Sequence, residues 1–141
     1  MAECTNDREI DITIDFLEAL SCLKDEAILT DVVVVVGEAE FSCHRVILAA
    51  ASEFFKAAIT TDMREAREGK ITLRDVTADV FSTLLSSIYE HKNVLTDDNL
   101  FDVWAAADML QMRSIIAQCA VKLKKIFETV LSTENGQSQA T

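Results

Sequence analysis

The chain of 141 residues is strongly acidic, with 24 Asp and Glu against 13 Lys and Arg and a formal net charge of −11 at pH 7. This length suits one domain around a single core. The excess of Asp and Glu opposes direct nucleic-acid binding, because Lys and Arg side chains must neutralise the phosphates of the nucleic acid. No stretch reaches the roughly 18 consecutive apolar residues needed to span a bilayer. We expect no secretory signal, and no membrane or nucleic-acid partner.

Half of the residues are hydrophobic, which is high for a domain of this size. Such a content predicts either a large core or a core together with a subunit interface. The composition leaves both open.

The cysteines are scattered along the sequence, at Cys4, Cys22, Cys43 and Cys119. No Cys-x-x-Cys pair occurs, and the adjacent Cys43 and His44 have no second pair at ligand spacing, so we expect no metal site. Buried or interfacial free thiols indicate a reducing compartment, which predicts a location in the cytoplasm or the nucleus.

Polar residues 1–9 are expected to form a flexible N-terminus, ahead of a domain over residues 10–131. An amphipathic helix is predicted over residues 11–24. Its apolar residues recur at helical spacing: Ile14, Leu17, Leu20 and Leu23. A short segment joins this helix to the rest of the chain, so the helix can pack on its own body or across a partner.

Three strands are predicted next. Five valines at 32–36 suit a strand buried on both faces. A turn over residues 37–40 and a return strand at 41–43 complete a hairpin. Ile71 and Leu73 alternate with polar neighbours, which predicts a half-buried third strand.

Helical periodicity predicts about five more helices, which makes the fold class α+β with helix in excess. Ser52, Thr77 and Thr96 are the expected N-caps. The last helix begins at Arg113. Residues 132–141 have the composition of a disordered tail.

No residues assemble into a predicted active site. Three glycines in the whole chain are too few for a phosphate-binding loop. Asp97 and Asp98 are adjacent and therefore point about 100° apart on a helix. His44 is expected to be a structural, hydrogen-bonded histidine. We therefore predict neither an enzyme nor a cofactor.

Two charged residues stand in apolar surroundings. Asp31 precedes the valine strand, and Arg45 precedes an apolar helix. A charge buried alone at such a position costs several kcal/mol. Each therefore reaches solvent, or the two pair with one another or across an interface.

Several stretches, in order, resemble the BTB/POZ domain signature. They are LTDVVV at 29–34, FSCHRVILAAASEFF at 41–55, ITLRDV at 71–76, Phe81 to Tyr89, and AAADMLQM at 105–112. The resemblance covers about residues 10–127. It implies a helical cluster capped by a short sheet, and an intertwined homodimer whose first helix packs against the partner.

The resemblance also implies roles for individual residues. Ile14 and Leu17 of the first helix would lie at the dimer interface, where positions matching Asp31 and Arg45 form a charged pocket.

Family members that recruit cullin-3 ubiquitin ligases carry an apolar residue, any residue and a glutamate in a loop that Met63-Arg64-Glu65 matches. The resemblance therefore implies that Met63 and Glu65 bind the cullin-3 N-terminal domain, with Tyr89 beside them. After Tyr89 the chain departs from the common Tyr-Thr-Gly, with Glu90-His91-Lys92.

The predicted function is a homodimeric substrate adaptor for cullin-3 ligases. The alternative is a dimerisation and corepressor-recruiting domain of a zinc-finger transcription factor, and a weaker third is a purely structural oligomeriser.

Overall fold

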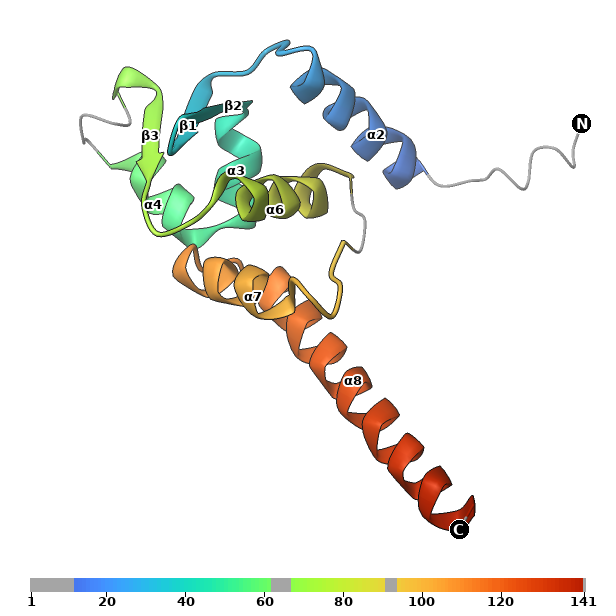
Figure 1. Ribbon diagram of the computed structural model, residues 1–141. Helices are drawn as coiled ribbons and strands as arrows, with labels where there is room; N and C mark the ends of the chain where they lie inside the picture. The colour runs from blue at the N-terminus through green and yellow to red at the C-terminus, as the bar shows by residue number, and fades with distance from the viewer. Residues whose placement is uncertain (1–11, 62–66, 91–93, 141) are drawn as a thin grey trace, which may run out of the picture.

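The computed structural model describes residues 12–61, 67–90 and 94–140, with side chains described from 15 to 133. The elements, in order, are α2 (Ile12–Asp25), β1 (Val32–Val36), β2 (Ala39–Cys43), α3 (Arg45–Ala51), α4 (Glu53–Thr60), β3 (Lys70–Leu73), α6 (Ala78–Glu90), α7 (Leu100–Met109) and α8 (Arg113–Ala140). The sheet lies at one end, α3, α4 and α6 lie in the middle, and α7 and α8 lie at the other end (Figure 1). The predicted α+β fold, a helical cluster capped by a short sheet, is confirmed.

The sheet has the strand order β2-β1-β3. β1 pairs antiparallel with β2 from Val32↔Cys43 to Val36↔Ala39, which confirms the hairpin. Gly37 makes the tight turn with φ +63°, a left-handed conformation that glycine adopts without strain. β3 pairs parallel with the other edge of β1. Parallel pairing requires the long crossover through α3 and α4.

The valine strand differs from its prediction. Val32, Val34 and Val36 are buried, whereas Val33 and Val35 are half-buried. Successive side chains of a strand point to opposite faces, and the helices fully cover one face here. The expectation of burial on both faces was wrong.

Ser52 begins α4 as predicted and also ties two parts of the fold together. Its Oγ accepts a hydrogen bond from the Phe55 N–H at 3.0 Å. The same hydroxyl donates to the carbonyl oxygen of Leu110 at 2.6 Å, across the turn between α7 and α8. The α3–α4 corner is therefore anchored to the C-terminal helices.

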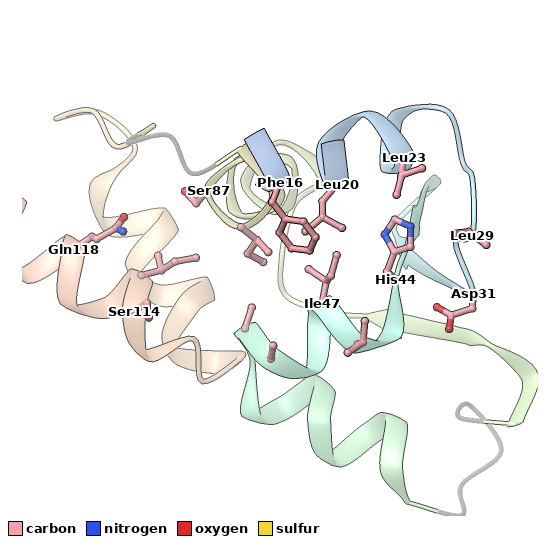
Figure 2. Close-up of a pocket in the computed structure, with 15 residues that line it drawn as sticks. Phe16, Leu20, Leu23, Leu29, Asp31, His44, Ile47, Ser87, Ser114 and Gln118 are labelled. Carbon is pink, nitrogen blue, oxygen red and sulfur yellow. The ribbon is translucent and has the colours of Figure 1, made fainter. Parts of the chain in front are cut away.

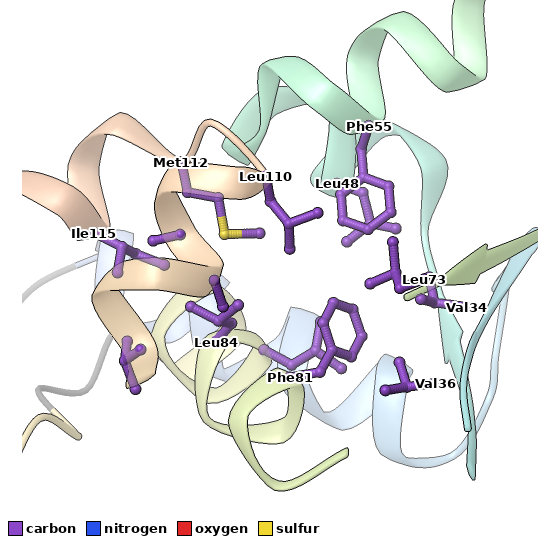
Figure 3. Close-up of a cluster of buried hydrophobic side chains, with 14 of the residues drawn as sticks. Val34, Val36, Leu48, Phe55, Leu73, Phe81, Leu84, Leu110, Met112 and Ile115 are labelled. Carbon is purple, nitrogen blue, oxygen red and sulfur yellow. The ribbon is translucent and has the colours of Figure 1, made fainter. Parts of the chain in front are cut away.

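The core joins the sheet to the helices through aromatic and aliphatic side chains (Figure 3). Phe81 of α6 packs edge-on against Phe41, with ring centroids 5.1 Å apart. Its ring also meets that of Phe55 at 6.3 Å. Full burial of one such side chain stabilises a fold by about 1.5–3 kcal/mol.

The predicted cap of α6 is confirmed, and that of α7 is wrong. Thr77 Oγ1 accepts from the Val80 N–H at 3.2 Å. Thr96, in contrast, exchanges hydrogen bonds with Asn99: its N–H donates to Asn99 Oδ1 at 2.7 Å, and the Asn99 N–H donates to Thr96 Oγ1 at 3.1 Å. This closed turn uses the capping groups, so α7 begins only at Leu100.

α8 continues to Ala140, through a stretch whose composition predicts a disordered tail. Its backbone N–H and C=O groups are satisfied by hydrogen bonds within the helix. Beyond the body of the domain the helix projects alone (Figure 1).

Candidate functional site, an apolar groove beside helix α2

An open groove of about 840 Å³ runs between α2, α3, α6 and the start of α8. Phe16 and Leu20 point into it from α2, opposite Ile47 of α3 (Figure 2). Ser114 and Gln118 of α8 lie at one end, and Asp31 lies at the other. We call this feature the α2 groove.

The lining of the α2 groove is mostly apolar, and three of its apolar side chains are strongly exposed. Leu29 is 79% exposed, Val46 is 74% exposed and Phe16 is 61% exposed. Contiguous apolar surface with a polar rim marks a site where another protein binds, because water contact with it is unfavourable. The groove is therefore suited to a protein partner.

The sequence reasoning did not assign Phe16, Leu29 and Val46 to the site. Phe16 and Val46 lie outside the buried stripes of their helices, and Leu29 lies in the segment between α2 and β1, so periodicity alone gave no role for them. The signal that could have found them is a large apolar side chain at a position where the pattern predicts solvent.

Asp31 and Arg45 are paired within the chain at the edge of the α2 groove. The backbone N–H of Arg45 donates to Asp31 Oδ1 at 2.7 Å. The Arg45 Nε–H donates to the backbone oxygen of Asp31 at 3.0 Å. Each side chain thus bonds to the other residue's backbone, and pairing across an interface stays a prediction. Asp31 remains exposed, and Arg45 is half-buried.

The other two residues predicted for the dimer interface lie on α2. Leu17 is half-buried, and Ile14 lies in the first turns of the helix, where the side chain is outside the described residues. Their role at an interface stays a prediction.

Tyr89 corrects the prediction that it binds a partner. Its side chain is only 1% exposed, so it has almost no surface to offer. The hydroxyl accepts from the His44 backbone N–H at 3.0 Å and lies 2.9 Å from His44 Nδ1. The predicted structural role of His44, which is itself 7% exposed, is confirmed. Met63 and Glu65 lie outside the described residues.

Buried titratable groups near the α2 groove are held in their neutral forms. Burial raises the pKa of the Cys43 thiol to about 12, an effect that the nearby Lys24 charge partly opposes. Burial also raises the pKa of Tyr89. A protonated, buried thiol is a poor nucleophile. These groups therefore serve packing and hydrogen bonding at neutral pH.

The residues that the structure describes contain no cluster of three or more His, Cys, Asp or Glu side chains that could hold a metal ion. No helix among them is long and apolar enough to cross a membrane.

The class of protein follows from the fold and from residues 20–127, which match the BTB/POZ domain family. The chain belongs to this family, whose domains are protein-interaction modules. It is 41% identical over 101 residues to human Kelch-like protein 6, covering 72% of this chain and 16% of that protein. It is 32% identical over 117 residues to human Kelch-like protein 38, covering 83% and 20%.

A solved structure has the same fold. The BTB domain of zebrafish PATZ1 matches with a TM-score of 0.71 and 26% identity, covering 80% of this chain and 92% of that one. The chain thus spans nearly all of a BTB domain but only a fifth or less of the Kelch-like relatives.

Proposed function

We propose that the domain forms a homodimer through the α2 groove and serves, within a longer adaptor, to bring a substrate to a cullin-3 ubiquitin ligase. The open apolar groove is the observation that carries the dimer. Free thiols and the family suit a protein of the cytoplasm or the nucleus.

A second copy of the chain is the partner that we propose for the groove. A two-fold interface places the same patch on both subunits, so one exposed apolar surface can bury another like it. Phe16, Leu29 and Val46 would then lose their contact with water together. Burial of apolar area at about 25 cal/mol per Å² would drive the association.

Position 46 offers a clean test of the dimer. Val46→Glu places a carboxylate on the groove wall in the first turn of α3, where the helix dipole favours it, so the fold should be retained. Val121→Glu is the matched control, because Val121 is 54% exposed on α8 and does not line the groove. Native mass spectrometry should give a dimer for the wild type and Val121→Glu, and a monomer for Val46→Glu. A monomeric wild type, or a dimeric Val46→Glu, would contradict the groove as the interface.

The cullin-3 part rests on the Kelch-like relatives and on the Met63-Arg64-Glu65 pattern. α4 ends at Thr60, shortly before that pattern. Phe54 and Met109 stand partly exposed, at 36% and 37%. The Phe54 N–H donates to the Leu110 oxygen at 3.4 Å, which places the start of α4 beside the end of α7. The exposed side chains of Phe54 and Met109 on these two elements would extend the contact surface.

A pull-down with the cullin-3 N-terminal domain tests this part. Met63→Asp and Glu65→Ala should each weaken capture. Their controls are Leu131→Asp, at an exposed position near the far end of α8, and Glu38→Ala, in the hairpin turn. Absence of binding by the wild type, or equal loss in the controls, counts against the adaptor role.

The likeness to the PATZ1 BTB domain favours a second candidate, a dimerisation domain that recruits corepressors for a zinc-finger transcription factor. Both candidates share the homodimer. Binding of a corepressor peptide without cullin-3 capture would favour the second.

A further inference from the structure

His44 joins three parts of the fold at the wall of the α2 groove. It is the N-cap residue of α3, and its backbone oxygen accepts from the N–H groups of Ile47 and Leu48. Its Nδ1 lies 2.9 Å from Tyr89 Oη of α6. Its Nε2 lies 3.0 Å from the backbone oxygen of Ile28, in the α2–β1 linker of residues 26–31.

The partners of the imidazole fix where its proton lies. A carbonyl oxygen only accepts, so Nε2 must carry a proton and donate to Ile28. In the neutral ring Nδ1 is then an acceptor, and the Tyr89 hydroxyl donates to it. Tyr89 Oη in turn accepts from the His44 backbone N–H. The neutral imidazole thus satisfies every group in the relay from Tyr89 to His44 to Ile28.

The α2–β1 linker needs such an anchor. Ala27 and Leu29, on either side of Ile28, have φ values of 55° and 63°. The left-handed conformation is unfavourable for residues with a β-carbon, so two of them in one short linker persist only where other contacts hold them. Leu29 is the most exposed apolar residue of the groove wall.

We propose that His44 is the positioning residue that fixes the α2–β1 linker, and with it Leu29, for the second subunit, and that it does so only as a neutral imidazole. The proposal rests on the proposed homodimer, because it names a pH-dependent control of that same interface.

Protonation would disrupt the relay at one defined atom. The imidazolium carries a second N–H, on Nδ1, which faces Tyr89 Oη. That oxygen can accept it, but the hydroxyl proton of Tyr89 then loses Nδ1 as its acceptor in a buried site. Lowering the pH through the range in which histidine side chains ordinarily change charge, about pH 5 to 8, is the way to test for this state.

Charged groups around His44 come from each packed element. Lys24 of α2 lies over the Tyr89 ring, with Nζ 5.4 Å from the centroid, and Arg45 follows His44 on α3. The positive charges of Lys24 and Arg45 disfavour the protonated form of the His44 ring. The negative charge of Asp31, at the start of β1, favours that form. Cys43 of β2 and Tyr89 of α6 keep their protons, because burial raises the pKa of both.

Hydrogen exchange of the backbone amides in the α2–β1 linker measures whether the hydrogen bonds of His44 hold this segment in place. The N–H groups of Glu26, Ala27, Ile28 and Asp31 are bonded within the fold and should be protected. On going from about pH 7.5 to about pH 5.5, protection corrected for intrinsic exchange should fall about tenfold, the factor for roughly one lost hydrogen bond. The dimer dissociation constant should rise by a similar factor.

Two substitutions separate His44 from other titrating groups. His44→Gln keeps an amide donor for the Ile28 oxygen but does not titrate, so linker protection should be equal at both pH values. His91→Gln is the matched control, since the chain has two histidines, and should keep the wild-type response. Should His44→Gln fail to fold, the wild type and His91→Gln decide: loss of the response in His91→Gln overturns the proposal.

The same measurement on the monomeric Val46→Glu variant separates this proposal from the proposed function. A pH response of the linker in that monomer supports the relay independently of any dimer. Wild-type protection that is equal at both pH values overturns the relay, even where the dimer is present. A linker response without any change in dimer affinity overturns the coupling to the interface.

Discussion

The carboxylate of Asp31 caps helix α3 from another part of the chain, by accepting the backbone N–H of Arg45 at 2.7 Å. The N-cap residue itself, His44, makes no side-chain cap hydrogen bond. An acidic group at a helix N-terminus is also favoured by the helix dipole. The residue that opens β1 therefore fixes the start of the helix that walls the α2 groove.

Asp31→Ala removes this cap and should lower the free energy of unfolding by about 1 kcal/mol. Asp31→Asn keeps an acceptor oxygen and should lose less. Glu38→Ala, in the exposed hairpin turn, is the control and should change little. Urea unfolding at one fixed protein concentration measures all three. Equal losses in Asp31→Asn and Asp31→Ala would contradict the capping role.

The same geometry decides what to expect of Asp31→Asn combined with Arg45→Gln, which removes both charges of the pocket that the family resemblance implies. Because Arg45 donates its backbone N–H, which glutamine retains, the pair should fold. The mass of the folded double variant, as monomer or dimer, then tests only whether the two side chains act at the interface.

Two helices end with a residue in the left-handed conformation that is not glycine. At the end of α2 the Ile28 N–H donates to the Leu23 oxygen at 2.8 Å, and the Ala27 N–H donates to the Lys24 oxygen at 3.0 Å. This is the Schellman pattern, with Ala27 where glycine is preferred. Gln111, with φ 56°, holds the same place after α7.

Ala27→Gly should therefore raise the free energy of unfolding, by about 0.5–1 kcal/mol, because relief of left-handed strain exceeds the added entropy of the unfolded chain. Ala57→Gly, at an exposed position inside α4, is the matched control and should lower it by a similar amount. Thermal unfolding of both variants shows whether each substitution raises or lowers the free energy of unfolding. Destabilisation by Ala27→Gly would show that the φ value of Ala27 carries no strain.

Local chemistry could be predicted from the sequence where one residue decides it. Ser52 and Thr77 cap their helices because a hydroxyl at the right spacing is enough. The prediction that Thr96 caps α7 was wrong because Asn99, three residues later, forms hydrogen bonds with Thr96 instead. The parallel pairing of β1 with β3 could not be predicted, since it depends on a long crossover rather than on local pattern.

Tyr89 shows where periodicity and resemblance compete. Its place in the apolar stripe of α6 predicts burial, and the structure agrees with the stripe rather than with the implied cullin contact. The α2 groove lay beyond prediction for a related reason. It combines stripe residues such as Leu20 and Leu23 with apolar side chains that local pattern assigns to solvent, and only the tertiary fold brings them together.

Ser52→Ala should cost about 1–3 kcal/mol, because it removes a helix cap and leaves the buried Leu110 oxygen without the donor that Ser52 provides. Ser82→Ala, at an exposed position inside α6, is the matched control and should be neutral or slightly stabilising. The urea concentration at the unfolding midpoint, measured for both variants, shows whether Ser52→Ala loses more stability than Ser82→Ala. A loss as small as that of the control would mean that water replaces the hydroxyl without penalty.

Alkaline pH should destabilise the domain through Cys43. Burial raises its pKa in the fold from 9.0 to about 12. The folded state therefore keeps a proton that the unfolded chain releases, so this contribution is complete below about pH 9 and is lost as pH rises toward about 12. Within that window the free energy of unfolding should fall by about 1.4 kcal/mol per pH unit for this group. Tyr89, whose pKa burial also raises, should add to the fall above its ordinary value of 10.0.

Cys43→Ala isolates the thiol. It should lower stability at neutral pH through lost packing, yet show a shallower decline between about pH 9 and about pH 11, because one group no longer titrates. Cys22→Ala removes an exposed thiol and should keep the wild-type slope. Urea unfolding at several pH values gives both slopes. If Cys43→Ala declines as steeply as Cys22→Ala, the Cys43 thiol ionises as readily in the fold as in the unfolded chain, and its burial does not hold the proton.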